Sequence, residues 1–329
     1  MTAAVADSAA RGRERLGRVN SARAARRRHA GTVLAFLSPW LLGVGLFFIY
    51  PLVSTVYFSF THYDLLSNPR WVGLANYRFM FTSDPDFVQS VQNTLWLVVV
   101  MVPSRILLAL GVGGLAVSLK RGVSAFRAMV YLPFLVPPVA GTIAFVFLLN
   151  PATGPVNEIL SWFGITGPGW FTSTVWAKPS LVLLSLWAIG DLMVIMMAAL
   201  LDVPTELHEA AAIDGASAPQ RFRYVTLPAI SPVLLFAMIT GIIETLQYFT
   251  QAEVAGKVAS GVTDLPGTTQ PPGYPEGATL TYPQWIVEQG FRQFNLGYAS
   301  ALSVVLFIAA VCVTAVLLRQ ARSFTGDAA

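Results

Sequence analysis

Six long apolar stretches constrain this chain more than any other feature of its sequence. Each is near or above the ~20 residues that an α-helix needs to cross a bilayer. Apolar residues make up 55% of the chain and charged residues only 12%. Backbone groups inside a bilayer must be hydrogen-bonded within their own segment, so an all-α polytopic membrane protein with six transmembrane helices is predicted. The stretches cover residues 32–60, 90–118, 128–149, 179–201, 229–250 and 297–318.

Six spans put both chain ends on one side of the membrane, and the basic residues indicate which side. Fifteen lysines and arginines fall in the N-terminal segment, the loop after the second stretch, the loop 202–228 and the C-terminus, against five in the other loops. Because cytoplasmic loops are enriched in basic residues, we expect both termini to be cytoplasmic, in the cell membrane. The predicted parts are a disordered basic extension at 1–30, a transmembrane domain at 31–320 with a long external loop at 252–296, and a cytoplasmic tail at 321–329.

The cytoplasmic loop 202–228 has its own pattern. Three alanines at 210–212 follow Glu209 and favour a helix, Gly215 supplies a turn, and Pro219 prevents simple continuation of that helix. Leu227-Pro228 is predicted to open the next apolar run, because a proline at a helix start loses no hydrogen bond. The loop therefore predicts a short helix, a turn and a second helix at the membrane surface. The alternative is an ordinary amphipathic interfacial loop.

Several motifs occur in the same order as in one transporter family. The spacing from Glu209-Ala210-Ala211 through Gly215 to Leu227-Pro228 resembles the coupling loop of ABC importer permeases, with Val225 where the pattern usually has Ile. Three further segments are similar to carbohydrate-importer permeases, specifically the first-type permease subunit. These segments are Tyr131-Leu132-Pro133-Phe134-Leu135-Val136-Pro137-Pro138, Asn150-Pro151-Ala152-Thr153-Gly154-Pro155-Val156-Asn157 and Gly297-Tyr298-Ala299-Ser300-Ala301.

This resemblance implies a type I ABC importer permease fold and import of a carbohydrate, such as a di- or oligosaccharide of the trehalose or maltose class, by alternating access. It implies four kinds of partner: a second homologous permease, two cytoplasmic ATPase subunits carrying ATP and Mg²⁺, an extracytoplasmic solute-binding protein, and the bilayer. The implied ATPase-coupling residues are Glu209, Ala210, Ala211, Asp214, Gly215, Leu227 and Pro228. The Gly- and Pro-rich external loop departs from the family pattern, so its contacts do not transfer.

Three other functions remain as alternatives at this stage. The solute could be a glycerol-phosphate compound or a polyol, because a separate binding protein sets much of the specificity in such systems. The chain could also be a secondary transporter or channel acting alone. A membrane-embedded enzyme is disfavoured, since the sequence has no phosphate-binding loop, no nucleophile motif and no ligand spacing for a metal. We therefore expect no cofactor on this chain, and its basic N-terminus indicates topology and lipid contact, not nucleic-acid binding.

Ionisable residues at membrane depth are candidates for the solute path. An unpaired charge there costs on the order of 2.5–3.5 kcal/mol, so Arg105, Asp191 and Glu244 need either a wet pathway or partners. Glu244, Gln247 and Tyr248 are expected to share one face of the fifth span and to suit a sugar. A buried salt bridge between Arg105 and either acid is the structural alternative.

Prolines in the spans are predicted to kink or break their helices, because each removes a backbone hydrogen bond. Kinked helices can line a cavity, although membrane helices also accept proline for packing alone. The prolines concerned are Pro51, Pro103, Pro133, Pro137 and Pro138.

Overall fold

A computed structural model describes residue 33 and residues 35–261 and 271–325 of the chain. The chain divides into two compact units, Met1–Tyr57 and Phe58–Ala329, which are described separately. The extension predicted at 1–30 lies outside the described residues, as do 262–270 of the external loop and the last four residues of the tail.

The first unit is formed by most of the helix Ala35–Ser59, which has 25 residues and is apolar enough to cross a membrane. Its middle is a π-helical turn, η1 (Gly45–Ile49), and its last part is α2 (Tyr50–Ser59). The wide turn stands directly before Pro51, whose ring would otherwise collide with the carbonyl four residues earlier. The helix therefore continues through Pro51.

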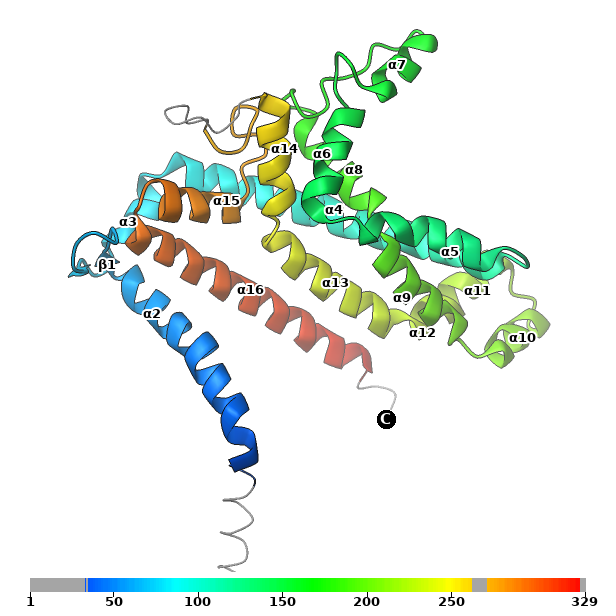
Figure 1. Cartoon of the computed structure of the whole chain (residues 1–329). Coiled ribbons are helices and arrows are strands. Elements are labelled where there is room, and N and C mark those ends of the chain that lie inside the picture. Colours follow the sequence, from blue (N-terminus) through cyan, green and yellow to red (C-terminus); the bar gives the residue numbers. More distant parts are fainter. Residues whose placement is uncertain (1–32, 34, 262–270, 326–329) are drawn as a thin grey trace, which may run out of the picture. The chain divides into compact units, whose positions relative to one another are not determined.

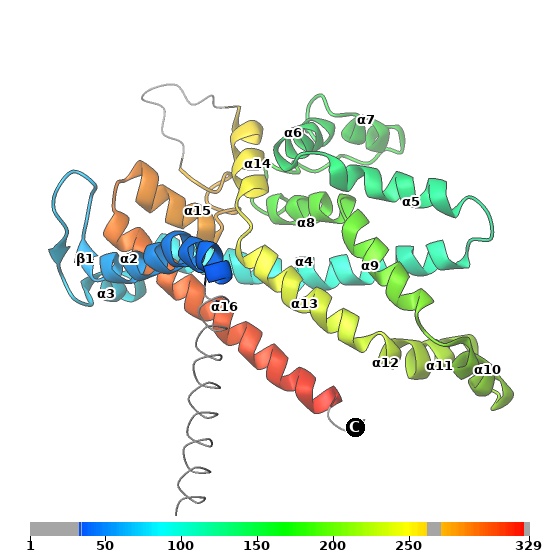
Figure 2. The ribbon, with the colours of Figure 1, turned by 60° about the horizontal axis from the view of Figure 1, so that its bottom comes forward.

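The second unit is built around α4 (Pro85–Ser118), a helix of 34 residues that contains Pro103 without ending there. Its N-terminus is capped by Asp84, which accepts the Phe87 N–H at 3.0 Å. Three helices pack along it: α8 (Ala177–Trp187), α9 (Gly190–Leu201) and α13 (Ser231–Leu246). Side by side with α13 in both views lies α16 (Leu296–Thr325) (Figures 1 and 2).

Three of the predicted spans are broken. Among the described residues, three helices are long and apolar enough to span alone, or up to six segments if each bent pair is one span. The first pair consists of α5 (Val123–Tyr131) with η2 (Leu132–Leu135), followed by α6 (Pro138–Leu148), and it is bent by 100°. Pro137 and Pro138 interrupt the backbone hydrogen bonds of the helix at this bend. Another is bent by 54° between α8 and α9, and the third by 66° at Ile230, before α13.

Short elements gather at opposite ends of this unit. At one end lie α10 (Thr205–Ile213), α11 (Ala218–Arg221), η3 (Phe222–Thr226) and α12 (Leu227–Ala229) (Figure 1). The opposite end carries α7 (Pro155–Trp162), α14 (Thr250–Ser260), α15 (Tyr282–Val287) and η4 (Glu288–Arg292). There too are α3 (Ala75–Thr82) and the antiparallel pair β1 (Thr61–His62) and β2 (Arg70–Trp71). The all-α fold class is confirmed, with these two-residue strands as its small exception.

Candidate functional site

The predicted helix–turn–helix is present at residues 205–221. Helix α10 ends at Ile213, and Gly215 follows with φ +80°, a left-handed conformation that side chains with a Cβ rarely adopt. The Gly215 N–H donates to the Ala212 oxygen at 3.1 Å and the Ala216 N–H to the Ala211 oxygen at 2.9 Å, which closes the helix end. Glycine is required here by its backbone angle and not by lack of space, because nothing lies within 4 Å of the place that a Cβ would take.

The second helix begins with a capping box. The Ser217 N–H donates to Oε1 of Gln220 at 2.7 Å, and Pro219 occupies the first turn of α11. Leu227-Pro228 begins α12 with a proline in its first turn, and α12 continues the run of α11 and η3 up to Ala229. The membrane helix α13 starts after Ile230 with its own proline, Pro232.

The surface of this helix–turn–helix is exposed and partly apolar. Glu209, Ala210, Asp214 and Gly215 are exposed, and Ala211 is half-buried. The side chain of Ile213 is 86% exposed, beside these acidic groups. A soluble protein partner would fit this combination of apolar and charged side chains.

A cavity of about 350 Å³ lies at the centre of the unit, where helices are interrupted. The break between η2 and α6 contributes Pro133, Val136 and Pro138, and the break between α8 and α9 contributes Trp187 and Ala188. The gap between α13 and α14 contributes residues 247–249. Interrupted helices expose backbone groups and ring edges that a continuous helix would cover, so polar groups are accessible at these breaks.

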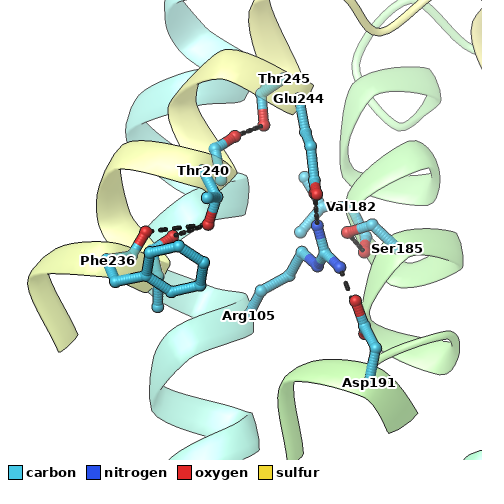
Figure 3. Close-up of polar contacts among 10 residues, drawn as sticks. Arg105, Val182, Ser185, Asp191, Phe236, Thr240, Glu244 and Thr245 are labelled. Carbon is cyan, nitrogen blue, oxygen red and sulfur yellow. Dashed lines mark hydrogen bonds and ion pairs between the residues drawn. The ribbon is translucent and has the colours of Figure 1, made fainter. Parts of the chain in front are cut away.

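Arg105 connects two carboxylates from different helices beside this cavity. Its Nη1 donates to Oε2 of Glu244 on α13 at 3.0 Å, and its Nη2 lies 3.8 Å from Oδ1 of Asp191 on α9 (Figure 3). The exposed fractions of the three side chains are 17% for Arg105, 31% for Asp191 and 59% for Glu244. The Arg105–Glu244 ion pair is the structural alternative that the sequence left open, and the three side chains also line the cavity.

Three buried polar atoms around the cavity have no hydrogen-bond partner among the described residues. They are Nε of Arg105, Oδ1 of Asp191 and the Tyr248 hydroxyl. Buried polar groups are normally hydrogen-bonded, and such a cluster of exceptions indicates a place for water or a polar ligand. One atom donates, one accepts, and the hydroxyl can do both, which is the requirement for binding hydroxyl groups.

One sequence prediction about these residues is wrong in detail. Gln247 and Tyr248 do not share a helical face with Glu244, because α13 ends at Leu246 and both residues lie in the tight turns that follow it. Asp191 is the second residue of α9, directly after the break between α8 and α9. Arg105, Asp191, Glu244, Gln247 and Tyr248 nevertheless all line the one cavity.

Other lining residues escape sequence reasoning because they are polar or aromatic residues of ordinary kinds. Ser185 and Trp187 precede the break between α8 and α9, and Thr250 and Gln251 begin α14. The available signal was Gly190, where a Cβ would lie 2.6 Å from the Tyr131 Cα. Only a glycine permits α9 to pass so close to the end of α5.

No group of three or more His, Cys, Asp or Glu residues that could hold a metal ion occurs in the part of the chain that the structure describes. The polar lining offers hydrogen bonds and one ion cluster to polar groups in the cavity.

Comparison with known families identifies the fold. Residues 105–323 match the family described as binding-protein-dependent transport system inner membrane component. The chain belongs to this family. It is an ABC importer permease, and the match runs from the Arg105 of the ion cluster through the helix–turn–helix and α16.

Curated relatives cover most of the permease. It is 32% identical to the sulfoquinovosyl glycerol transport system permease protein SmoG of Agrobacterium fabrum, over 87% of this chain and 89% of that protein. It is 31% identical to the trehalose/maltose transport system permease protein MalF of Thermococcus litoralis, over 86% of this chain and 91% of that protein. A solved bacterial ABC transporter that imports the acidic polysaccharide alginate shares the fold, with a TM-score of 0.74, 22% identity, and coverage of 91% of this chain and 97% of that chain.

Proposed function

We propose that this permease is one half of the membrane pore of an ATP-driven importer that moves a carbohydrate into the cytoplasm by alternating access. The observation that carries the proposal is the central cavity, which combines a guanidinium, two carboxylates and two side-chain amides with aromatic rings that include Phe134, Trp187 and Tyr248. Polar groups suit sugar hydroxyls and flat rings suit the C–H face of a sugar. Relatives named for trehalose/maltose, lactose and arabinooligosaccharides support a di- or oligosaccharide.

The proposed complex contains four further subunits of three kinds. A second, homologous permease would complete the wall of the solute path, and a solute-binding protein would deliver the carbohydrate from outside. Two ATPase subunits, which hold ATP and Mg²⁺, would lie on the cytoplasmic side, and one of them would dock on α10 and α11 of this permease. The exposed Glu209 and Ile213 support this docking, and the contacts that join α10, α11, η3, α12 and α13 in succession support transmission of the ATPase movement to the cavity. Such coupling requires different contacts in the two states.

The proposed orientation places α10–α12 and both chain termini in the cytoplasm. The excess of basic residues in those loops supports it. A secondary transporter acting alone would need no ATPase, and a permease for a glycerol-phosphate compound or polyol would share all features of the coupling surface. Copurification of an ATPase argues against the first alternative, and a ligand screen of the cognate binding protein separates the second.

The coupling assignment is tested by two substitutions, Gly215→Pro and Glu209→Lys, in the assembled transporter. Proline cannot adopt φ +80°, and the lysine reverses a charge at the docking surface. Both variants are expected to insert normally and to lose ATP-driven carbohydrate uptake.

A matched control is Gly164→Pro, because Gly164 also has a positive φ, +71°, with open space around it, but follows α7 at the other end of the unit. This variant is expected to keep most of the uptake. Normal uptake by both coupling variants, with the ATPase still bound, would contradict the assignment.

A further inference from the structure

The ion cluster lies between two cavities. Arg105, Asp191 and Glu244 line the central cavity, and all three also line a second cavity of about 190 Å³. The second cavity is bounded otherwise by residues such as Ile195, Phe236 and Thr240. A group of side chains that borders two neighbouring spaces forms the partition between them.

The two cavities follow one another along the same helices. On α13, Phe236 and Thr240 of the second cavity precede Glu244, while Gln247 and Tyr248 of the central cavity follow it. Because α13 begins next to α12, the second cavity is the one nearer to the helix–turn–helix. A solute moving from the central cavity toward that end would pass the ion cluster.

The partition carries an unbalanced charge. The side chains named as lining the two cavities include one guanidinium and two carboxylates as their only acidic or basic groups. When all three are ionised, the cluster has a net charge of about −1. Arg105 and Asp191 are partly buried, so this charge acts over a longer range than it would in water. An anion would be repelled there and an uncharged solute would not.

The three side chains of the cluster also do not satisfy all of one another's hydrogen-bonding groups. The Arg105–Asp191 separation of 3.8 Å is too long for a hydrogen bond, and Glu244 is 59% exposed. Arg105 Nε and Asp191 Oδ1 have no hydrogen-bond partner among the described residues. These atoms can exchange their present neighbours for solute hydroxyls at little loss, whereas an ion pair serving only as a clamp would have its hydrogen-bonding groups satisfied.

We propose that Arg105, Asp191 and Glu244 form a charge-selective constriction on the solute path, which passes uncharged polyhydroxylated solutes and opposes anions. This inference rests on the proposed function in that it needs a path through the permease. It goes beyond that function by assigning selectivity to a partition inside the membrane domain, in addition to any selection by a binding protein.

The test uses charged thiol reagents and no sugar. Thr240→Cys, in the second cavity, is introduced into a Cys312→Ala permease in the assembled transporter of intact, energised cells. Cationic and anionic methanethiosulfonates are added outside, and each rate is divided by the rate at Gln251→Cys, in the central cavity. After this normalisation, the cationic reagent is expected to react with Thr240→Cys at least about tenfold faster than the anionic reagent does.

Substitutions inside the cluster should change this ratio in opposite directions. Glu244→Gln or Asp191→Asn should reduce the preference for the cation several-fold, and Arg105→Gln should increase it. Glu158→Gln, an exposed carboxylate on α7, should leave it unchanged.

Equal normalised rates of the two reagents at Thr240→Cys would overturn the proposal. So would a cation-to-anion rate ratio that the cluster variants do not alter. Failure of both reagents to reach Thr240→Cys would also contradict it, because the two cavities would then not be connected. ATP-driven uptake is measured separately in the same cells, so loss of the proposed function is distinguished from loss of charge selection.

Discussion

Tyr248 buries its hydroxyl against the central cavity without a hydrogen-bond partner among the described residues. Its neighbours in the cavity, Gln247 and Glu244, are polar, so the hydroxyl is a candidate for contact with solute and not for support of the fold. Sequence reasoning singled out these side chains because polar groups are rare at membrane depth. It could not place Tyr248 beyond a helix end, because nothing in the apolar run before Gln247 signals that α13 stops there.

Tyr248→Phe is expected to leave the stability of the permease unchanged or to increase it by about 1 kcal/mol, since a buried group without a partner is removed. Uptake of the carbohydrate is expected to fall several-fold. Thermal unfolding in detergent and uptake in proteoliposomes measure the two effects.

Tyr282→Phe is the matched control. The Tyr282 hydroxyl is buried and donates to the Leu302 oxygen at 2.9 Å. Burial, with a smaller effect of the Asp84 carboxylate, raises the pKa of Tyr282 above its ordinary value, so the hydroxyl remains a donor. This variant is expected to lose about 1 kcal/mol of stability and to keep its solute preference. A larger loss of stability in Tyr248→Phe than in Tyr282→Phe would show that Tyr248 supports the fold.

Individual elements show where sequence patterns suffice and where they do not. The apolar stretches locate the long helices, because membrane thickness fixes a minimum length. The break before α6 is also readable from Pro137 and Pro138. The break at Ile230 is readable in the same way from Pro232 in the first turn of α13. The break between α8 and α9 is not, because no proline marks it. The helix–turn–helix is readable because Gly215 can adopt the positive φ of a turn and Pro219 prevents α10 from simply continuing.

Asp84 joins three elements at the end of the unit that carries α15. One oxygen caps α4, and the other accepts the Trp285 Nε1–H at 2.8 Å and the Tyr298 hydroxyl. Asp84→Ala is expected to destabilise the permease by about 3 kcal/mol, because it removes a cap and leaves two buried donors unsatisfied. Thermal unfolding of the purified permease measures the change.

Asp86→Ala provides the comparison for that variant. Asp86 lies in the same first turn of α4 and is half-buried, so its replacement loses mainly an interaction with the helix dipole, worth about 0.3–1 kcal/mol. Equal losses in the two variants would mean that Asp84 acts through its charge alone and not through its three hydrogen bonds.

At the scale of the whole permease, the order of loops along the chain agrees with their placement in space. The turn at Gly122 precedes α5, and in both views that turn lies toward the end of the unit that carries α10–α12 (Figures 1 and 2). The loop that contains α7 lies at the opposite end. Counting apolar stretches predicts this alternation, although the count alone does not show which stretches are broken.

The orientation of the permease in the membrane is predicted by its basic residues and is tested by thiol labelling. The chain has a single cysteine, Cys312, which is replaced by alanine before new cysteines are introduced. Ser161→Cys on α7 and Lys120→Cys before the Gly122 turn are both exposed positions in the described part of the chain. An impermeant maleimide added to intact cells is expected to label Ser161→Cys and to label Lys120→Cys only after permeabilisation, because Lys120 belongs to the basic face. The reverse pattern would place α10 and α11 outside the cell, where no ATPase could reach them, and would exclude ATP-coupled import through this surface.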